Sequence, residues 1–194
     1  MNRGDVITRT VGGATESVTL PPINMNHLLT IRVDSGRVSG FHILPTSVVT
    51  ISSTSEITLS AGVLQVVDSA GKPIAGAEIK LTPLRVPASA HDAFEARVEV
   101  VDAAGSRIAY DPAKTFYPQG WTQAQIEQAV YSAYVQHYKA GGTPFFLRMR
   151  LATPKGVKIC MRVSGNQSAA GIALTGIATA YLDQGQKLTA RDAP

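Results

Sequence analysis

The sequence has little of what a disulfide-bonded, zinc-binding or membrane-spanning protein needs. Its 194 residues include one cysteine, Cys160, so no disulfide can close within the chain, and no Cys/His cluster has zinc-ligand spacing. No run of about 18 apolar residues occurs, and residues 1–5 lack the apolar stretch of a signal peptide. We therefore expect no structural metal, no membrane insertion and no standard secretion signal in this sequence.

Charged residues are also few. They make up 16% of the chain, against 44% for apolar residues, a composition typical of a globular protein rather than a disordered one. The length allows one sizeable core or two small lobes. The net charge of +4 favours contact with polyanions, although it is mild compared with that of dedicated nucleic-acid binders.

Most of the chain has the pattern of β-strands, and one segment has the pattern of a long helix. Thr122 is a good N-cap, residues 123–138 contain neither glycine nor proline, and Gly141 follows the segment. Its apolar residues recur at helical spacing, which predicts a helix over about 122–139. Strands are predicted from β-branched content or alternation within 47–64, 63–67, 77–81, 94–101, 145–152, 157–163 and 171–182. The expected fold class is α+β, with antiparallel sheets packed against one long helix.

The polar N-terminal residues differ from the rest. Residues 1–24 end in Pro21 and Pro22, which indicates an arm or linker, with possible edge strands at 8–11 and 18–20. Residues 25–194 are then expected to form one domain. Within it, an inserted β-hairpin and loop region is expected around 46–92.

Two histidines, His27 and His42, flank an alternating run, a turn signal and a second short run. Imidazole titrates near neutral pH, so one ring can accept a proton while another donates one. An antiparallel hairpin, or a helix end followed by a strand, would bring both rings to one side. Each could equally be an ordinary surface or core-edge histidine. We expect His91 to be a solvated loop residue and His137 to be a structural residue at the C-terminal end of the helix.

Two further motifs follow in order. Lys114-Thr115-Phe116-Tyr117-Pro118 precedes Gly120-Trp121-Thr122 and the predicted helix, and Thr179-Ala180-Tyr181 lies near the C-terminus. Together with His27-Leu28-Leu29 and Gly40-Phe41-His42, these motifs resemble the signature of EndoU-type endoribonucleases, in particular the bacterial polymorphic-toxin branch. The resemblance covers residues 26 to 183.

The resemblance implies a catalytic set and a reaction. His27 and His42 would be general acid and base, in either order, and Lys114 would stabilise the charge that grows on the phosphoryl oxygens. The RNA 2′-OH would attack the adjacent phosphorus and leave a 2′,3′-cyclic phosphate, without metal or cofactor. Tyr181 would stack on a base, preferably uridine, and Thr179 would hydrogen-bond its edge. Thr115 would contact the base or the phosphate.

The resemblance also implies a biological setting. Bacterial members of the family are often C-terminal toxin modules, so the expected partners are RNA, with tRNA as one candidate, and a cognate immunity protein. The expected location is that of a secreted or delivered effector in bacterial competition, acting in the target-cell cytoplasm. The alternatives are a non-enzymatic β-rich binding or adhesin-type domain, supported by the many Val/Thr/Ser strands, and a degenerate nuclease fold that only binds RNA.

Overall fold

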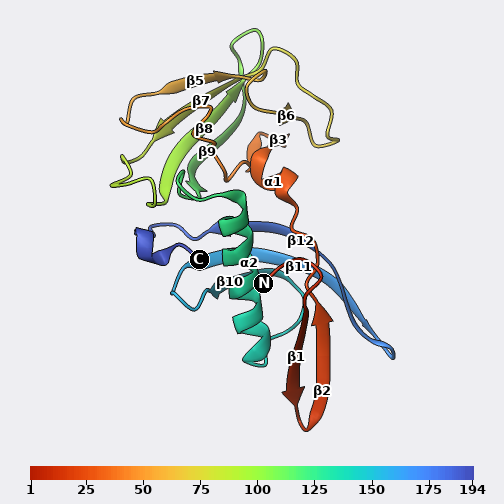
Figure 1. Ribbon diagram of the computed structural model, residues 1–194. Coiled ribbons are helices and arrows are strands. Elements are labelled where there is room, and N and C mark those ends of the chain that lie inside the picture. Colours follow the sequence, from red (N-terminus) through yellow and green to blue (C-terminus); the bar gives the residue numbers. More distant parts are fainter. The chain divides into compact units, whose positions relative to one another are not determined.

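The computed structural model describes residues 1–194 and combines two α-helices, one short 3-10 helix and twelve strands (Figure 1). This confirms the α+β class. In chain order the elements are β1 (Val6–Val11), β2 (Ala14–Thr19), α1 (Met25–Leu29), β3 (Ile31–Asp34), β4 (Arg37–Gly40), β5 (Ile57–Ser60), β6 (Val66–Val67), β7 (Glu78–Pro83), β8 (Phe94–Val101), β9 (Arg107–Phe116), α2 (Gln123–Lys139), β10 (Phe146–Ala152), β11 (Lys158–Ser168), β12 (Gly171–Leu182) and η1 (Ala190–Asp192).

The chain forms two compact units, and it passes between them more than once. Unit 1 contains Met1–Asn24, Trp121–Asp183 and Ala190–Pro194, and unit 2 contains Met25–Gly120 and Gln184–Thr189. Unit 1 holds a two-stranded and a three-stranded sheet, and unit 2 holds a seven-stranded sheet. The candidate residues His27, His42, Lys114 and Thr115 therefore belong to unit 2. Thr179 and Tyr181 belong to unit 1.

Unit 2 is built on a seven-stranded sheet with the order β5-β7-β8-β9-β4-β3-β6. Alternation in β8 directs Ala96 and Val98 into the core, while Arg97 between them is exposed. Three phenylalanines fill the centre of the core. The Phe116 ring stacks on Phe94 with centroids 4.7 Å apart and meets the edge of Phe41 at 5.1 Å.

The region expected as an insertion around 46–92 contributes three of the strands of this sheet. The hairpin that the sequence predicts between 63–67 and 77–81 does not form: β7 pairs with β5 in antiparallel orientation, while β6 pairs with β3 in parallel orientation. β7 also pairs along its length with β8. β5 and β7 are therefore continuous with the main sheet. The alternating apolar residues of β7, Ile79 and Leu81, are fully buried in the core of that sheet.

A tight hairpin joins the two histidine motifs. β3 and β4 pair from Ile31 opposite Gly40 to Asp34 opposite Arg37, which leaves Ser35 and Gly36 as a two-residue turn. Both turn residues have positive φ, at 50° and 77°, the conformation that matches the twist of paired strands.

Gly40 ends the hairpin at a point where the backbone passes very close to helix α1. Its φ is +69°, and a Cβ atom there would lie 2.5 Å from the Thr30 carbonyl oxygen and still closer to that of His27. Only glycine fits this position without a shift of the backbone. The next residue, Phe41, is also left-handed with φ 57°, although it is not a glycine.

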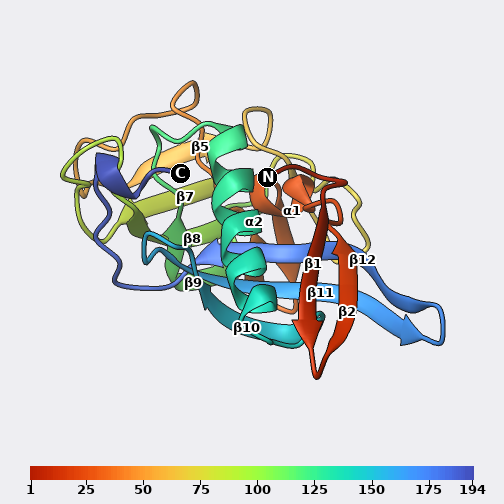
Figure 2. The ribbon, with the colours of Figure 1, turned by 60° about the horizontal axis from the view of Figure 1, so that its bottom comes forward.

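Unit 1 packs helix α2 against the antiparallel sheet β10-β11-β12, as Figure 2 shows. The predicted helix is confirmed. Thr122 is its N-cap and forms a capping box with Gln125, in which each side chain accepts a hydrogen bond from the other residue's backbone N–H. The buried side chains of the helix are tyrosine and aliphatic: Ile126, Ala129, Val130, Tyr131, Ala133, Tyr134, Val135 and Tyr138.

Residues 1–24 are a folded part of unit 1 rather than the arm or linker that their sequence indicates. β1 and β2 form a hairpin, and β2 also lies close to β12. Arg9 holds the hairpin to the end of α2: its guanidinium donates to the carbonyl oxygens of Tyr138 (3.1 Å) and Gly142 (2.5 Å) and pairs with Glu16 (2.8 Å). The apolar side chain of Val18 is buried as well. A polar composition concealed this small number of anchoring residues.

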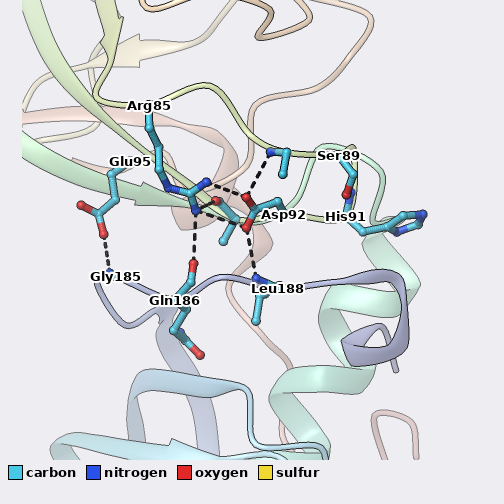
Figure 3. Close-up of polar contacts among 10 residues, drawn as sticks. Arg85, Ser89, His91, Asp92, Glu95, Gly185, Gln186 and Leu188 are labelled. Carbon is cyan, nitrogen blue, oxygen red and sulfur yellow. Dashed lines mark hydrogen bonds and ion pairs between the residues drawn. The ribbon is translucent and has the colours of Figure 1, made fainter.

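Segment Gln184–Thr189 belongs to unit 2 because a buried carboxylate holds it (Figure 3). Asp92 is 3% exposed and accepts hydrogen bonds from the Arg85 guanidinium, at 2.5 and 3.2 Å, and from the backbone N–H of Leu188 at 3.1 Å. Arg85 also donates to the Gln186 carbonyl oxygen at 3.3 Å. Burial tends to raise the pKa of Asp92, but these hydrogen bonds lower it below its usual value.

Replacing Gly40 with alanine should destabilise the protein far more than the same change at Gly36. Both residues have positive φ, which costs alanine about 1 kcal/mol. A Cβ at Gly36 meets nothing within 4 Å, whereas at Gly40 it collides with the backbone of α1. We expect losses in the free energy of unfolding of about 1 kcal/mol for Gly36→Ala and at least about 3 kcal/mol for Gly40→Ala, measured by urea denaturation. Equal losses would show that the close approach does not exist.

Candidate active site

Backbone hydrogen bonds set the distance between the two imidazoles. The amides of Phe41 and His42 donate to the carbonyl oxygens of His27 (3.0 Å) and Leu28 (2.7 Å), and the Ile43 amide also donates to Leu28. Leu28 is fully buried and anchors the short helix α1. As a result the His27 and His42 rings lie 6.4 Å apart between centroids, tilted by 43°. The helix end and the hairpin act together, which matches the expectation that both rings come to one side.

His42 is held on both its backbone and its side chain by the segment that ends β9. Its carbonyl oxygen accepts from the Tyr117 amide at 2.9 Å, and its Nδ1 lies 2.8 Å from the Thr115 carbonyl oxygen. A carbonyl oxygen only accepts, so Nδ1 carries the hydrogen in this contact. The neutral ring therefore has Nε2 as its unprotonated nitrogen. His42 is 7% exposed, whereas His27 is half-buried.

Lys114 lies on β9 opposite Ala96 of β8. Side chains alternate along a strand, so Lys114 shares the core face of the sheet with Phe116, and it is only 5% exposed. Its ammonium donates to the Val38 carbonyl oxygen at 3.2 Å and to the Asp111 carboxylate at 3.4 Å. These contacts satisfy a buried charge that would otherwise be costly.

Burial and mutual repulsion set the protonation states of the three groups. Burial, followed by the charge of Lys114, lowers the pKa of His27 and lowers that of His42 well below its usual value near 6.5. The hydrogen bond to Thr115 opposes this shift at His42. Burial also lowers the pKa of Lys114, while Asp111 raises it. Both imidazoles are thus neutral at pH 7, with His42 the harder of the two to protonate.

The structure brings His27, His42 and Lys114 together within unit 2. Thr115 joins them through its carbonyl oxygen, because its side chain leaves β9 on the face opposite to Lys114. A contact between the Thr115 side chain and RNA stays a prediction. Thr179 and Tyr181 lie on β12 in unit 1, so their part in base recognition also stays a prediction.

The other two histidines differ in how they fit their expected roles. His137 lies in the last turn of α2 and contacts the Thr143 carbonyl oxygen at 3.0 Å, which confirms a structural contact. His91 lies in a loop, as predicted, but it is half-buried rather than solvated, and its Nδ1 is buried without a hydrogen-bond partner.

Three features of the site have no part in the sequence-based prediction. These are the Asp111 partner of Lys114, the Thr115 carbonyl contact and the close approach of Gly40 to α1. The first has no sequence signal, because side chains three residues apart on a regular strand leave opposite faces, and an irregularity in the β8–β9 register lies between Asp111 and Lys114. The other two depend on backbone geometry that residue types do not report.

Comparison of the chain with protein-family models, with curated proteins and with solved structures finds no match. No group of three or more His, Cys, Asp or Glu side chains is arranged to hold a metal ion. Neither α-helix is long and apolar enough to cross a membrane.

Stability should decrease as the pH falls below about 6.5. Both histidines have folded-state pKa values below the unfolded value, so in that range the unfolded chain binds protons that the folded chain does not. Each histidine lowers the free energy of unfolding by up to about 1.4 kcal/mol for each pH unit between its unfolded and folded pKa values. Above about pH 7.5 the contribution of the histidines to stability is constant. Urea denaturation at pH 7.5, 6.5 and 5.5 measures this slope.

The variant His42→Asn isolates the larger contribution. Asparagine places an amide N–H where Nδ1 stands, so it can keep the hydrogen bond to Thr115 while removing a titrating group. We expect a shallower loss of stability between pH 6.5 and 5.5 in this variant. An unchanged slope would show that the His42 ring is not kept neutral by its surroundings.

Proposed function

We propose that the protein is a metal-independent endoribonuclease toxin that cleaves single-stranded RNA by attack of the 2′-OH, leaving a 2′,3′-cyclic phosphate. The observation that carries the proposal is the grouping of two imidazoles, 6.4 Å apart, with a buried lysine that perturbs the pKa of both. The same three residues form the catalytic part of the resemblance to EndoU-type endoribonucleases. The scheme needs a base, an acid and a cation, and one unit of the protein supplies all three.

The environments of the two histidines favour a division of roles. A general base has to be neutral before it reacts, and His42 has the pKa that is lowered further, with Nε2 as the unprotonated nitrogen. His27 is more exposed and less perturbed, so it is the ring that more readily carries a proton. We therefore assign the 2′-OH proton acceptor to His42 and the donor to the departing 5′-oxygen to His27.

Lys114 supplies the fixed cation of the scheme. Negative charge grows on the non-bridging phosphoryl oxygens as the 2′-oxygen attacks, and a charge held in a poorly solvated place stabilises it strongly. Asp111 and the Val38 carbonyl oxygen hold the ammonium in position before the substrate arrives. The same ammonium disfavours protonation of His42, which keeps the base ready.

Base selection is assigned to unit 1. Thr179 and Tyr181 are two residues apart on β12, so both side chains leave the same face of the strand. A tyrosine ring can stack on an unpaired base, and a hydroxyl can donate to or accept from a pyrimidine edge. The resemblance makes uridine the preferred base.

The biological setting that we propose follows the same resemblance. The chain would act as a secreted or delivered effector in the cytoplasm of a target cell, on tRNA or another RNA with unpaired nucleotides. A cognate immunity protein would protect the producing cell.

A degenerate nuclease that binds RNA without cutting it is the second candidate. The observation in its favour is the burial of His42, which is only 7% exposed and bonded to the Thr115 carbonyl oxygen. A histidine with those contacts can serve packing alone. The variants below separate a structural histidine from a catalytic one.

Purified protein should cleave a uridine-containing oligoribonucleotide in the presence of a chelator and leave a cyclic phosphate end. The same oligonucleotide with 2′-deoxyuridine at the cleaved position should stay intact, because the attacking hydroxyl is missing. His42→Asn and His27→Asn should each lower the cleavage rate by about 10²- to 10⁴-fold. Lys114→Met should lower it similarly, since the phosphoryl charge loses its cation.

His137→Asn is the matched control, because His137 lies on α2 in the other unit. This variant should cleave the oligonucleotide at the rate of the parent protein. Thermal unfolding of each variant separates loss of fold from loss of chemistry. Binding of the oligonucleotide without cleavage by the parent would support the degenerate nuclease instead. If the two histidine variants cut like the parent, the assignment of acid and base is wrong.

A further inference from the structure

The positive charge of the chain is not spread evenly. Residues 145–183, which contain β10, β11 and β12, hold five lysines and arginines but one acidic residue, Asp183. This excess of four equals the net charge of the whole chain. The rest of the sequence has 13 basic and 13 acidic residues, so the excess charge of the protein resides in one small sheet.

The strand register places most of this charge on one face. Arg150 of β10, Cys160 of β11 and Tyr181 of β12 lie opposite one another across the sheet. Side chains two residues apart share a face, so Lys158 and Arg162 join this row on β11. Arg162 in turn lies opposite Thr179.

Side-chain contacts confirm the placement of the arginines. The Arg148 guanidinium lies over the Tyr181 ring at 5.9 Å from its centroid, and it also hydrogen-bonds that side chain. Arg150 pairs with Asp183 at 2.9 Å, yet its side chain is 63% exposed. Asp183, the one acidic residue within 145–183, thus pairs with Arg150. It does not balance the other basic side chains, so the face has a net positive charge.

The opposite face of the same sheet is apolar. Leu151, Ile159 and Leu182 lie opposite one another and are all buried. This face packs against helix α2. The basic side chains therefore play no part in the core of unit 1, and their concentration on the other face needs a different explanation.

We propose that this basic sheet face, formed by Arg148, Arg150, Lys158, Arg162, Thr179 and Tyr181, is the surface that binds the RNA strand. The inference rests on the proposed function for the identity of the ligand as RNA. Guanidinium groups hold phosphates through paired hydrogen bonds, and the tyrosine ring offers a stacking surface among them. An aromatic ring flanked by arginines on a flat sheet suits a single strand whose bases are unpaired.

Arg148 and Arg162 are the residues that we assign to phosphate contacts next to the stacked base. Both are exposed. Arg148 lies on β10, next to the strand that holds Cys160, and Arg162 lies on β11, two residues from Cys160 and opposite Thr179 of β12. Arg148 already contacts the Tyr181 ring, so a base that stacks there brings its phosphate within reach of that guanidinium. Arg150 is held by Asp183 and by a hydrogen bond to Cys160, which makes it a less available contact.

Equilibrium binding of a fluorescent uridine-rich single-stranded oligoribonucleotide tests the proposal. The full chain is used with His42→Asn, so that the RNA is not cut during the titration. Replacing Arg148 and Arg162 together with glutamine should raise the Kd at least tenfold. It should also reduce the slope of log Kd against log salt by about 1.4, since each lost phosphate contact accounts for about 0.7. Tyr181→Leu should raise the Kd by about tenfold, because the stacking surface is lost.

The matched control replaces Arg97 and Arg107, two exposed arginines of unit 2, with glutamine. This double variant has the same net charge as the test variant and should bind within about twofold of the His42→Asn protein. Equal weakening by both double variants would contradict the proposal. Heparin binding as tight as RNA binding, with no effect of Tyr181→Leu, would also contradict it and would indicate a general polyanion or acidic-protein surface.

Cleavage assays on proteins that retain His42 separate this inference from the proposed function. If the parent cuts RNA but Arg148→Gln with Arg162→Gln binds and cuts like the control, the basic sheet face is not the RNA surface although the nuclease assignment holds. If the parent does not cut RNA but binding is lost in that double variant, the surface assignment holds and the nuclease assignment fails.

Discussion

The contact between Gly40 and the end of helix α1 is the constraint on which the candidate site depends. Because no side chain stands at Gly40, the backbone can approach the carbonyl oxygens of His27 and Thr30 closely. The next amides then bond to α1, which fixes His42 relative to His27. The backbone thus fixes the spacing of the two residues, and the contact of His42 Nδ1 with the Thr115 carbonyl oxygen orients the His42 ring.

The burial of Lys114 and His42 lowers the stability of the fold and also sets the protonation states of the two groups. Lys114 and His42 are almost completely removed from water, a costly arrangement for two groups that can both be cationic. Hydrogen bonds from the ammonium to Asp111 and Val38, and from the imidazole to Thr115, offset part of that cost. What the arrangement yields is a lysine cation beside a histidine that resists protonation, the combination that a base-catalysed attack on a phosphodiester needs.

Sequence reasoning was most successful where local signals were strong. The capping residue Thr122 and the uninterrupted apolar face located α2, and the turn residues between the histidines located the β3–β4 hairpin. It failed for the N-terminal residues, because a few buried contacts such as those of Arg9 and Val18 decide whether a polar hairpin docks. It could not foresee that His42 contacts a carbonyl oxygen 73 residues later in the chain, since residue types carry no information on such long-range backbone geometry.

The central claim is that His42 is a neutral base with Nδ1 protonated, while His27 is the ring that takes up a proton more readily. A pH titration followed by nitrogen NMR of the labelled histidines measures both the tautomer and the order of protonation directly. The account predicts that His42 shows a protonated Nδ1 and an unprotonated Nε2 at neutral pH, and that it gains its second proton at lower pH than His27. A His42 ring that is protonated at neutral pH, or that carries its hydrogen on Nε2, would contradict it.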